Sequence, residues 1–169
     1  MTENLLDLPA LIPSWKLALR SANRSPRTIT TYLSGVNSFL SWCDRTGTPP
    51  ELTKRNAQGW VADMLERGAQ PATGSTWLGA LKRFSAWLAE EGEIPSDQLL
   101  GVKPPKMDRK VTQALTDDQL KALLKTCKGK TFRDRRDEAI IRLLAETGMR
   151  ASELVDLQIS DVDLARGLL

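Results

Sequence analysis

The sequence predicts a mainly α-helical protein, and three observations favour this class. Apolar residues recur at spacings of three and four over most of residues 8–90, where the alternation typical of β-strands is missing. N-capping side chains precede these apolar runs, and glycines follow them. Of the 169 residues, 41% are hydrophobic, which suffices for one ordinary domain or two small ones with packed cores. This composition excludes a disordered chain.

Four helices are expected in the first part of the chain. The clearest begins at Ser25, a good N-cap that is followed by proline, and it is expected to stop at Gly47. The other three are expected over about residues 8–21, 53–66 and 72–90. Four amphipathic helices with short connections predict a compact four-helix bundle over residues 1–100.

A basic linker is expected over residues 101–111, between the bundle and a second block of residues 112–169. Two adjacent prolines disfavour a helix there and keep the chain extended. The linker contains one acidic residue and four cations, which are Lys103, Lys106, Arg109 and Lys110. Each cation could neutralise one phosphate of a nucleic acid, although a linker that is merely solvated has the same composition.

The second block is expected to be helical. Thr116 and Gln119 predict a capping box at the start of one helix, and another helix is expected over about residues 132–146. Gly148 is well placed to end that helix in a left-handed conformation, before a short helix over about residues 151–157.

The end of the chain indicates that the second block is only part of a domain. Residues 161–169 alternate in a way that could start a strand, but no second strand follows to pair with it. Three helices and one such strand make a weak core. We therefore expect residues 112–169 to be incomplete as a domain.

The composition excludes several classes of function. Histidine is absent, which excludes Ser-His-Asp and Cys-His nucleophile systems and histidine-ligated metals. Cys43 and Cys127 form no Cys-x-x-Cys pair, so neither a zinc site nor a disulfide framework is expected. No signal peptide or membrane-spanning run is recognisable, so we expect a soluble, cytoplasmic protein. The net charge of +3 is mildly compatible with a polyanionic partner.

The segment of residues 146–154 carries the most specific chemistry in the sequence. Gly148 forces a tight turn that places Arg150 at the start of the next helix, with Glu153 three residues further on and within reach. A guanidinium held by a carboxylate suits a phosphodiester, because charge accumulates on the non-bridging oxygens as the phosphorus becomes five-coordinate. An ordinary solvated ion pair has the same spacing, so both interpretations stand at this point.

Residues 115–164 resemble the opening of the catalytic domain of tyrosine recombinases of the phage integrase family. The similarity comprises a capped helix, an Arg-Asp-rich run at residues 133–137, the motif Thr-Gly-Met-Arg-Ala-Ser-Glu-Leu at residues 147–154, and Asp-Val-Asp at residues 161–163. Residues 25–32 and 78–88 resemble the core-binding domain of the same family. The resemblance implies a SAM-like core-binding bundle, a linker, and the truncated helical start of a mixed α/β catalytic domain.

This resemblance implies roles for two residues of the second block. Arg150 corresponds to the first catalytic arginine, which clamps the scissile phosphate, and Glu153 to the acidic residue that supports the active site. The nucleophilic tyrosine and the other catalytic residues would lie beyond Leu169, so the chain alone is expected to be inactive. Tyr32, the single tyrosine, lies on an apolar stripe and is interpreted as a packing residue. The longer enzyme would cleave and rejoin DNA through a 3′-phosphotyrosyl intermediate, as in phage integration and excision, with no metal and no cofactor.

The resemblance also implies double-stranded DNA as the partner. The two domains are expected to close around a core-type attachment half-site, with the linker crossing the DNA backbone. The candidate contacts of the bundle are Ser25, Thr28, Thr76, Lys82 and Arg83. Helix capping alone explains the serine at position 25, and Lys82 and Arg83 could both be solvated. Of the five candidates we prefer Thr28 and Arg83.

Assembly and location follow from the same resemblance. Four protomers of the full-length enzyme would assemble on DNA, whereas this chain is expected to be monomeric or weakly associating. The expected location is the cytoplasm of a prokaryotic cell, at the nucleoid.

Two other functions are compatible with the sequence. A stand-alone helical regulator would bind specific DNA without chemistry and would have no longer parent enzyme. Reading the gene beyond Leu169 separates this possibility from a recombinase. A helical scaffold for another protein would make the linker cations irrelevant, so charge reversal at Lys106 and Arg109 would leave its partner binding intact.

Overall fold

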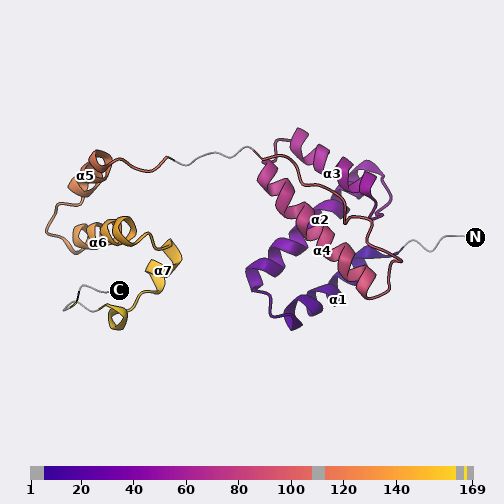
Figure 1. Cartoon of the computed structure of the whole chain (residues 1–169), viewed down its shortest axis with the longest axis horizontal. Coiled ribbons are helices and arrows are strands. Elements are labelled where there is room, and N and C mark those ends of the chain that lie inside the picture. The colour runs from indigo at the N-terminus through magenta and orange to yellow at the C-terminus, as the bar shows by residue number, and fades with distance from the viewer. Residues whose placement is uncertain (1–5, 108–112, 163–165, 167–169) are drawn as a thin grey trace, which may run out of the picture. The chain divides into compact units, whose positions relative to one another are not determined.

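The computed structural model describes residues 6–107, 113–162 and 166, and all regular structure in these ranges is helical (Figure 1). The chain divides into two compact units after residue 109, and each unit is described by itself. The mainly α-helical class predicted from the sequence is confirmed.

The first unit contains the four predicted helices. Their bounds are α1, Leu8–Ser21; α2, Pro26–Thr46; α3, Lys54–Glu66; and α4, Pro71–Glu90. Each predicted range agrees with the observed helix to within a residue at either end. The predicted four-helix bundle is confirmed.

Side-chain caps explain where α1, α2 and α3 begin, whereas α4 begins at Pro71 without a side-chain cap. The Ser25 hydroxyl accepts a hydrogen bond from the Thr28 backbone N–H, and Thr53 caps α3 in the same way through Asn56. At the other end of α2, Gly47 adopts the left-handed conformation with φ +65°. The N–H of the next residue then reaches back to the Cys43 carbonyl and completes the helix end.

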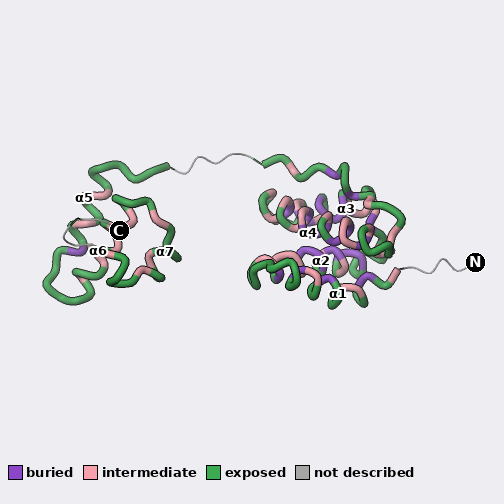
Figure 2. Tube along the Cα trace, turned by 60° about the horizontal axis from the view of Figure 1, so that its bottom comes forward, coloured by how far each residue is buried: buried purple, intermediate pink, exposed green. Residues whose placement is uncertain are grey.

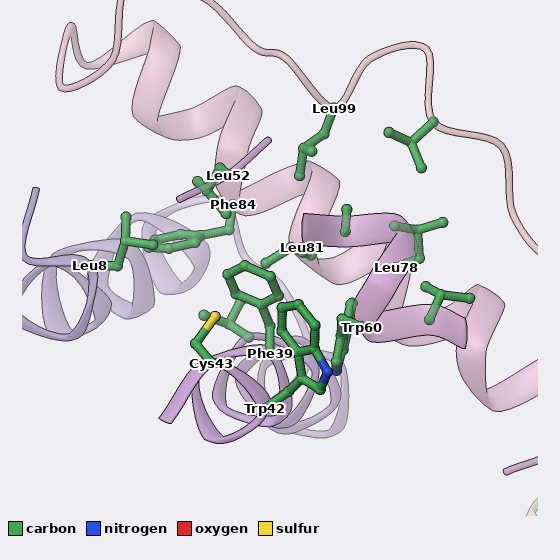
Figure 3. Close-up of a cluster of buried hydrophobic side chains, with 14 of the residues drawn as sticks. Leu8, Phe39, Trp42, Cys43, Leu52, Trp60, Leu78, Leu81, Phe84 and Leu99 are labelled. Carbon is green, nitrogen blue, oxygen red and sulfur yellow. The ribbon is translucent and has the colours of Figure 1, made fainter. Parts of the chain in front are cut away.

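Aromatic side chains form the centre of the bundle. In Figure 3 the rings of Phe39, Trp42 and Trp60 lie against one another, and Phe39 meets Trp60 edge-on at 5.6 Å between ring centroids. Helices α2 and α4 cross closely at Gly35, where an added Cβ would lie 2.9 Å from the Ala80 Cβ. The largest fully buried side chains include Trp15, Phe39, Trp60, Leu78, Leu81, Phe84 and Leu88.

The chain that follows α4 packs back onto the bundle before the linker begins. The buried Ser85 hydroxyl donates to the Asp97 carboxylate at 2.5 Å, and this carboxylate also accepts from the Leu99 N–H. Leu99 and Val102 are buried, with 0% and 2% of their surface exposed. Their side chains therefore belong to the core of the first unit.

The described part of the second unit contains three α-helices and one short 3₁₀ turn. They are α5, Asp117–Thr126; α6, Phe132–Thr147; α7, Ala151–Asp156; and the 3₁₀ turn Ile159–Asp161. The capping box of Thr116 and Gln119 is confirmed, with hydrogen bonds in both directions between the two residues. The left-handed conformation of Gly148 is confirmed as well, with φ +67°.

The strand expected from residue 161 does not begin in the part that the structure describes. Asp161 closes the 3₁₀ turn, because the Val162 N–H donates locally to the Ile159 carbonyl rather than to a neighbouring strand. Residues 163–165 and 167–169 lie outside the described residues.

Burial differs sharply between the units, as the purple segments of Figure 2 show. Among the described residues of the second unit, Cys127 alone is buried. Phe132 and Val155 each expose 81% of their surface, and Ile159 exposes 93%. The described residues of the second unit thus form helices without a closed core, although α5 and α6 both begin with a capping box. None of the helices in the described ranges combines the length and apolarity that crossing a bilayer requires.

Candidate nucleic-acid interface

The turn between α6 and α7 is built by local hydrogen bonds. The Thr147 hydroxyl donates to the Leu143 carbonyl at 2.6 Å and accepts from the Met149 N–H at 3.2 Å. The Gly148 N–H donates to the Leu144 carbonyl at 3.1 Å, and its left-handed backbone reverses the chain. This geometry delivers Arg150 to the position immediately before α7.

Arg150 and Glu153 contact each other through two hydrogen bonds. One Glu153 carboxylate oxygen accepts from the Arg150 backbone N–H at 2.7 Å, and the other accepts from the guanidinium Nη1 at 2.9 Å. A single carboxylate therefore caps α7 and orients the arginine side chain. The contact that the spacing predicted is present, whereas the catalytic roles of both residues stay predictions.

Although it is paired with Glu153, the Arg150 guanidinium can still bind an anion. Glu153 has a pKa below its ordinary value, first because the Arg150 N–H donates to its carboxylate and second because the guanidinium does. The Arg150 side chain is 82% exposed and the Glu153 side chain 52%. Since Nη1 alone contacts Glu153, the other guanidinium N–H groups face solvent and match the oxygens of a phosphate.

In the bundle, Ser25 and Thr28 form a hydroxyl pair at the start of α2. Their oxygens lie 2.9 Å apart, and Ser25 also accepts from the Thr28 N–H. Helix capping explains why a serine occupies position 25, as the sequence indicated. Thr28, which is partly buried, places a second hydroxyl at the same helix end, where the helix dipole favours anions.

Arg83 is exposed on α4, and two contacts fix its side chain. Its Nη1 donates to the Gly79 carbonyl at 2.9 Å. Its guanidinium carbon lies 5.1 Å from the centre of the Tyr32 ring. Tyr32 in turn stacks on Trp15, with 6.2 Å between centroids and 11° between planes. The packing role predicted for Tyr32 is present, but the contact with Arg83 was not expected from the sequence.

Lys82 and Thr76 are both bonded within the bundle. The Lys82 ammonium donates to the carbonyls of Leu100 and Val102 at 2.9 and 3.1 Å. It holds the segment that follows α4, a structural role that the sequence analysis missed because these partners are 18 and 20 positions away. The Thr76 hydroxyl donates to the Ala72 carbonyl at 2.9 Å, and its residue is exposed. DNA contact by either residue stays a prediction.

The linker cations divide into two pairs. Lys103 and Lys106 are exposed, whereas Arg109 and Lys110 lie outside the described residues. Pro105 lies close to α4, at 3.5 Å from the position of a Cβ added to Gly74. The first half of the predicted linker is thus packed on the bundle with its lysines facing solvent.

One ion pair between helices escaped the sequence analysis. Arg45 of α2 donates to Asp63 of α3 through both terminal nitrogens, at 3.3 and 2.7 Å. Hydrogen bonding by Arg45 lowers the pKa of the Asp63 carboxyl. The partners are 18 positions apart, so helical spacing carries no signal for the pair. Because both side chains are partly exposed, the pair adds little to stability.

No cluster of three or more cysteine, aspartate or glutamate side chains suited to a metal ion occurs in the described ranges. Both cysteines are buried as free thiols. The candidate contacts described above are hydroxyls and cations, the groups that contact phosphates in nucleic-acid complexes.

Comparison with known families matches each unit separately. Residues 11–92 match the family described as phage integrase, N-terminal SAM-like domain. Residues 113–169 match the phage integrase family. Both matches concern one kind of protein, and together they leave residues 1–10 and 93–112 unmatched.

Individual relatives agree with these family matches. The tyrosine recombinase XerC of Pseudomonas fluorescens is 30% identical over 153 residues, which cover 89% of this chain and 51% of that protein. The tyrosine recombinase XerD of Listeria innocua is 29% identical over 148 residues, 86% of this chain and 50% of that protein. The chain thus spans about half the length of these curated relatives.

A solved structure has a similar fold. The integrase from mycobacterium phage Brujita matches with a TM-score of 0.53 over 94% of this chain and 52% of that one. The sequences are 22% identical, so this likeness concerns the fold alone.

Proposed function

The chain belongs to the phage integrase family of tyrosine recombinases, and we propose that it is the DNA-binding portion of a site-specific recombinase. The observation that carries the proposal is the Arg150–Glu153 pair, set by a fixed turn in a chain whose two units both match this family. The bundle and the linker bind one core-type half-site of double-stranded DNA. The second unit presents Arg150 to the scissile phosphate.

The contacts of the bundle supply the binding part of this function. Thr28 offers a hydroxyl at a helix start, and Arg83 offers a guanidinium whose orientation is fixed by two contacts. Exposed Lys103 and Lys106 add phosphate contacts that depend on salt. Ser25, Thr76 and Lys82 are secondary candidates. Capping accounts for Ser25, the Thr76 hydroxyl donates to the Ala72 carbonyl, and the Lys82 ammonium holds the segment after α4, whereas Arg83 uses only Nη1 in its bond to Gly79.

Arg150 supplies the catalytic part of the function. In a strand-exchange reaction the phosphorus becomes five-coordinate, and negative charge grows on its non-bridging oxygens. A guanidinium pre-oriented by Glu153 stabilises this charge without reorganising during the step. Tyr32, the single tyrosine of this chain, packs against Trp15 in the bundle, so the role of this chain alone is to bind DNA without cleaving it. It needs no metal or cofactor for this role.

The proposal includes assembly and location. The full-length recombinase exchanges strands of two DNA sites, for example in phage integration and excision, as a tetramer. This chain binds a half-site as a monomer or a weakly associating species. The relatives are bacterial, and we place the protein in the bacterial cytoplasm, at the nucleoid.

Selection from randomised 30-base-pair duplexes tests the binding proposal. We expect the chain to enrich one short sequence and to bind it more tightly than a scrambled duplex in band-shift titrations. Arg83→Gln should weaken this binding and reduce the dependence of log Kd on log salt by about one. Arg55→Gln, an exposed arginine on α3, removes the same charge and serves as the control. Equal, weak binding to all duplexes contradicts the proposal.

A covalent-trapping assay with the full-length protein distinguishes a recombinase from a regulator that only binds DNA. On a nicked half-site substrate, the wild-type enzyme should accumulate a covalent protein–DNA complex. Arg150→Ala should lower the rate of its formation about 100- to 1,000-fold, while half-site affinity stays nearly unchanged. Near-normal cleavage by Arg150→Ala contradicts the assignment of this residue. A gene that stops at Leu169, with sequence-specific binding retained, favours the regulator.

A further inference from the structure

We propose that Tyr32 is a positioning residue for DNA binding, which holds the Arg83 guanidinium ready for a backbone phosphate. The inference rests on the proposed function, since it assigns to Tyr32 a part in the same interface. It goes beyond the packing role that the position of Tyr32 in the sequence indicates.

The observed geometry joins three helices in one stack. The Arg83 guanidinium of α4 lies 5.1 Å from the centre of the Tyr32 ring of α2. The Tyr32 ring lies nearly parallel to Trp15 of α1, at 11°. Trp15 is 2% exposed and also contacts Phe84, with 4.9 Å between ring centroids. The ring below Arg83 is therefore anchored in the core and cannot easily turn away.

The contacts of Arg83 leave part of its donor set free. A ring attracts the face of a guanidinium, whereas hydrogen bonds leave from its edge. Nη1 donates to the Gly79 carbonyl, one helical turn earlier on α4. In the described structure Nε and Nη2 have no such partner, and this edge matches two phosphate oxygens.

The stack lies near the helix start that the proposed function uses. Thr28 is four positions before Tyr32, so the two side chains project from the same face of α2. A phosphate bound by the Thr28 hydroxyl and a phosphate bound by Arg83 would belong to one stretch of DNA backbone. Tyr32 connects the two contacts without touching DNA itself.

The expected effect is modest and specific. A long arginine side chain loses rotamer freedom when it binds, and a ring that already orders it removes part of this loss. An exposed cation–π contact corresponds to about a two- to fivefold change in affinity. Tyr32→Leu, which keeps an apolar side chain but removes the π face, should weaken binding by that factor. Tyr32→Phe, which keeps the ring, should bind like the wild type.

A double-mutant cycle with the duplex enriched by the selection experiment tests this inference. If Tyr32 acts through Arg83, Tyr32→Leu should cause no further loss of affinity in an Arg83→Gln background. An equal loss in both backgrounds overturns the inference, because Tyr32 then acts on the fold alone. Unchanged affinity of Tyr32→Leu overturns it as well, while the proposed function survives. If the wild-type chain binds no duplex, the proposed function fails and this inference fails with it.

Folding is checked by urea unfolding of each variant before affinity is compared. Should Tyr32→Leu lose the cooperative transition, Tyr32→Met, with its flexible apolar side chain, takes its place in the cycle. The Arg83 Nε–H resonance gives a readout that does not depend on DNA. It should shift in Tyr32→Leu through loss of the ring current and stay near its wild-type position in Tyr32→Phe; an unchanged resonance in Tyr32→Leu overturns the inference.

Discussion

The two units of this chain obey the same local rules but differ in packing. Residues 6–107 enclose a core in which Phe39, Trp60 and Phe84 are fully buried, whereas Cys127 is the one buried residue among those described in the second unit. Both units nevertheless have well-formed caps, for example at Ser25 and at Thr116. Local hydrogen bonds therefore set where helices begin and end, and burial decides which unit is stable.

This difference also separates two ways of building a functional site. Arg83 is positioned by a ring that is anchored in a core, through residues from three helices. Arg150 is positioned by Glu153 and the turn at Gly148, all within a few residues. A site of the second kind forms without a closed core, since each of its hydrogen bonds is local.

The largest expected effect comes from truncating one phenylalanine in each unit. Phe84 is fully buried in the bundle, and Phe132 is 81% exposed at the start of α6. Phe84→Ala should lower the free energy of unfolding by about 3–5 kcal/mol, whereas Phe132→Ala should change it by less than about 0.5 kcal/mol. Urea titration followed by tryptophan fluorescence measures the stability of the bundle in both variants, because all five tryptophans belong to the bundle.

Circular dichroism in the same titrations covers the second unit, which contains no tryptophan. A loss of helix signal in Phe132→Ala as large as that in Phe84→Ala would mean that the second unit has a core of its own, and the comparison above would be wrong.

A smaller effect is expected at the closest approach of two bundle helices. An added Cβ at Gly35 would lie 2.9 Å from the Ala80 Cβ and 3.1 Å from the Trp77 carbonyl oxygen, and neither can move freely. Gly35→Ala should therefore destabilise the bundle by about 1–3 kcal/mol. The matched control is Gly79→Ala, whose nearest neighbour is the flexible end of Arg83 at 3.3 Å.

In Gly79→Ala the higher helix propensity of alanine should leave stability unchanged or raise it by up to about 1 kcal/mol. Thermal unfolding of both variants checks the pair. Equal stability changes in the two variants would show that the α2–α4 crossing is less tight than the structure indicates.

The sequence predicts most of the fold because the fold depends on local signals. For example, α2 is predicted by its own apolar periodicity, by its cap at Ser25 and by the glycine that ends it, and all three signals lie within or next to the helix. The strand expected near residue 161 was wrong for Asp161, since alternation alone cannot show whether a neighbouring strand exists to accept its hydrogen bonds. The capping box of Thr131 and Asp134 was visible in the sequence but was not recognised.

In the candidate site, too, the local contacts were predictable from the sequence and the contacts between helices were not. Arg150 and Glu153 are three residues apart, so their contact follows from helical spacing. The carbonyl partners of Lys82 and the Tyr32 ring that contacts Arg83 come from segments far along the chain, and no spacing rule places Tyr32 next to a guanidinium on another helix. Contacts of this kind depend on how the helices cross, which tertiary packing decides.

Each unit contains one cysteine, so the rates at which the two thiols react compare how well the two units are closed. Burial and the charge of Asp44 raise the pKa of Cys43 to about 11, so roughly one thiol in a thousand is ionised at pH 8. Cys127 lies in the unit without a closed core, which opens more readily. With a chromogenic disulfide reagent in native buffer, Cys127 should react at least about tenfold faster than Cys43.

Cys127→Ser should leave only the slow reaction, and both thiols should react quickly in urea. Equally fast modification of Cys43 in native buffer would mean that the bundle is no better closed than the second unit.

The smallest effect concerns the locally built Arg150 site. Glu153 has a lowered pKa in the folded chain, so its contact with Arg150 is fully present above the unfolded-state pKa and is lost as the pH falls through the lower folded-state value. Carbon NMR of the Glu153 carboxyl should give a midpoint below the ordinary glutamate value. Arg150→Ala removes only the guanidinium, while the backbone N–H, the larger cause of the shift, continues to donate. Most of the lowering should therefore survive in Arg150→Ala. An ordinary midpoint in that variant would show that the side chain, rather than the helix cap, organises this site.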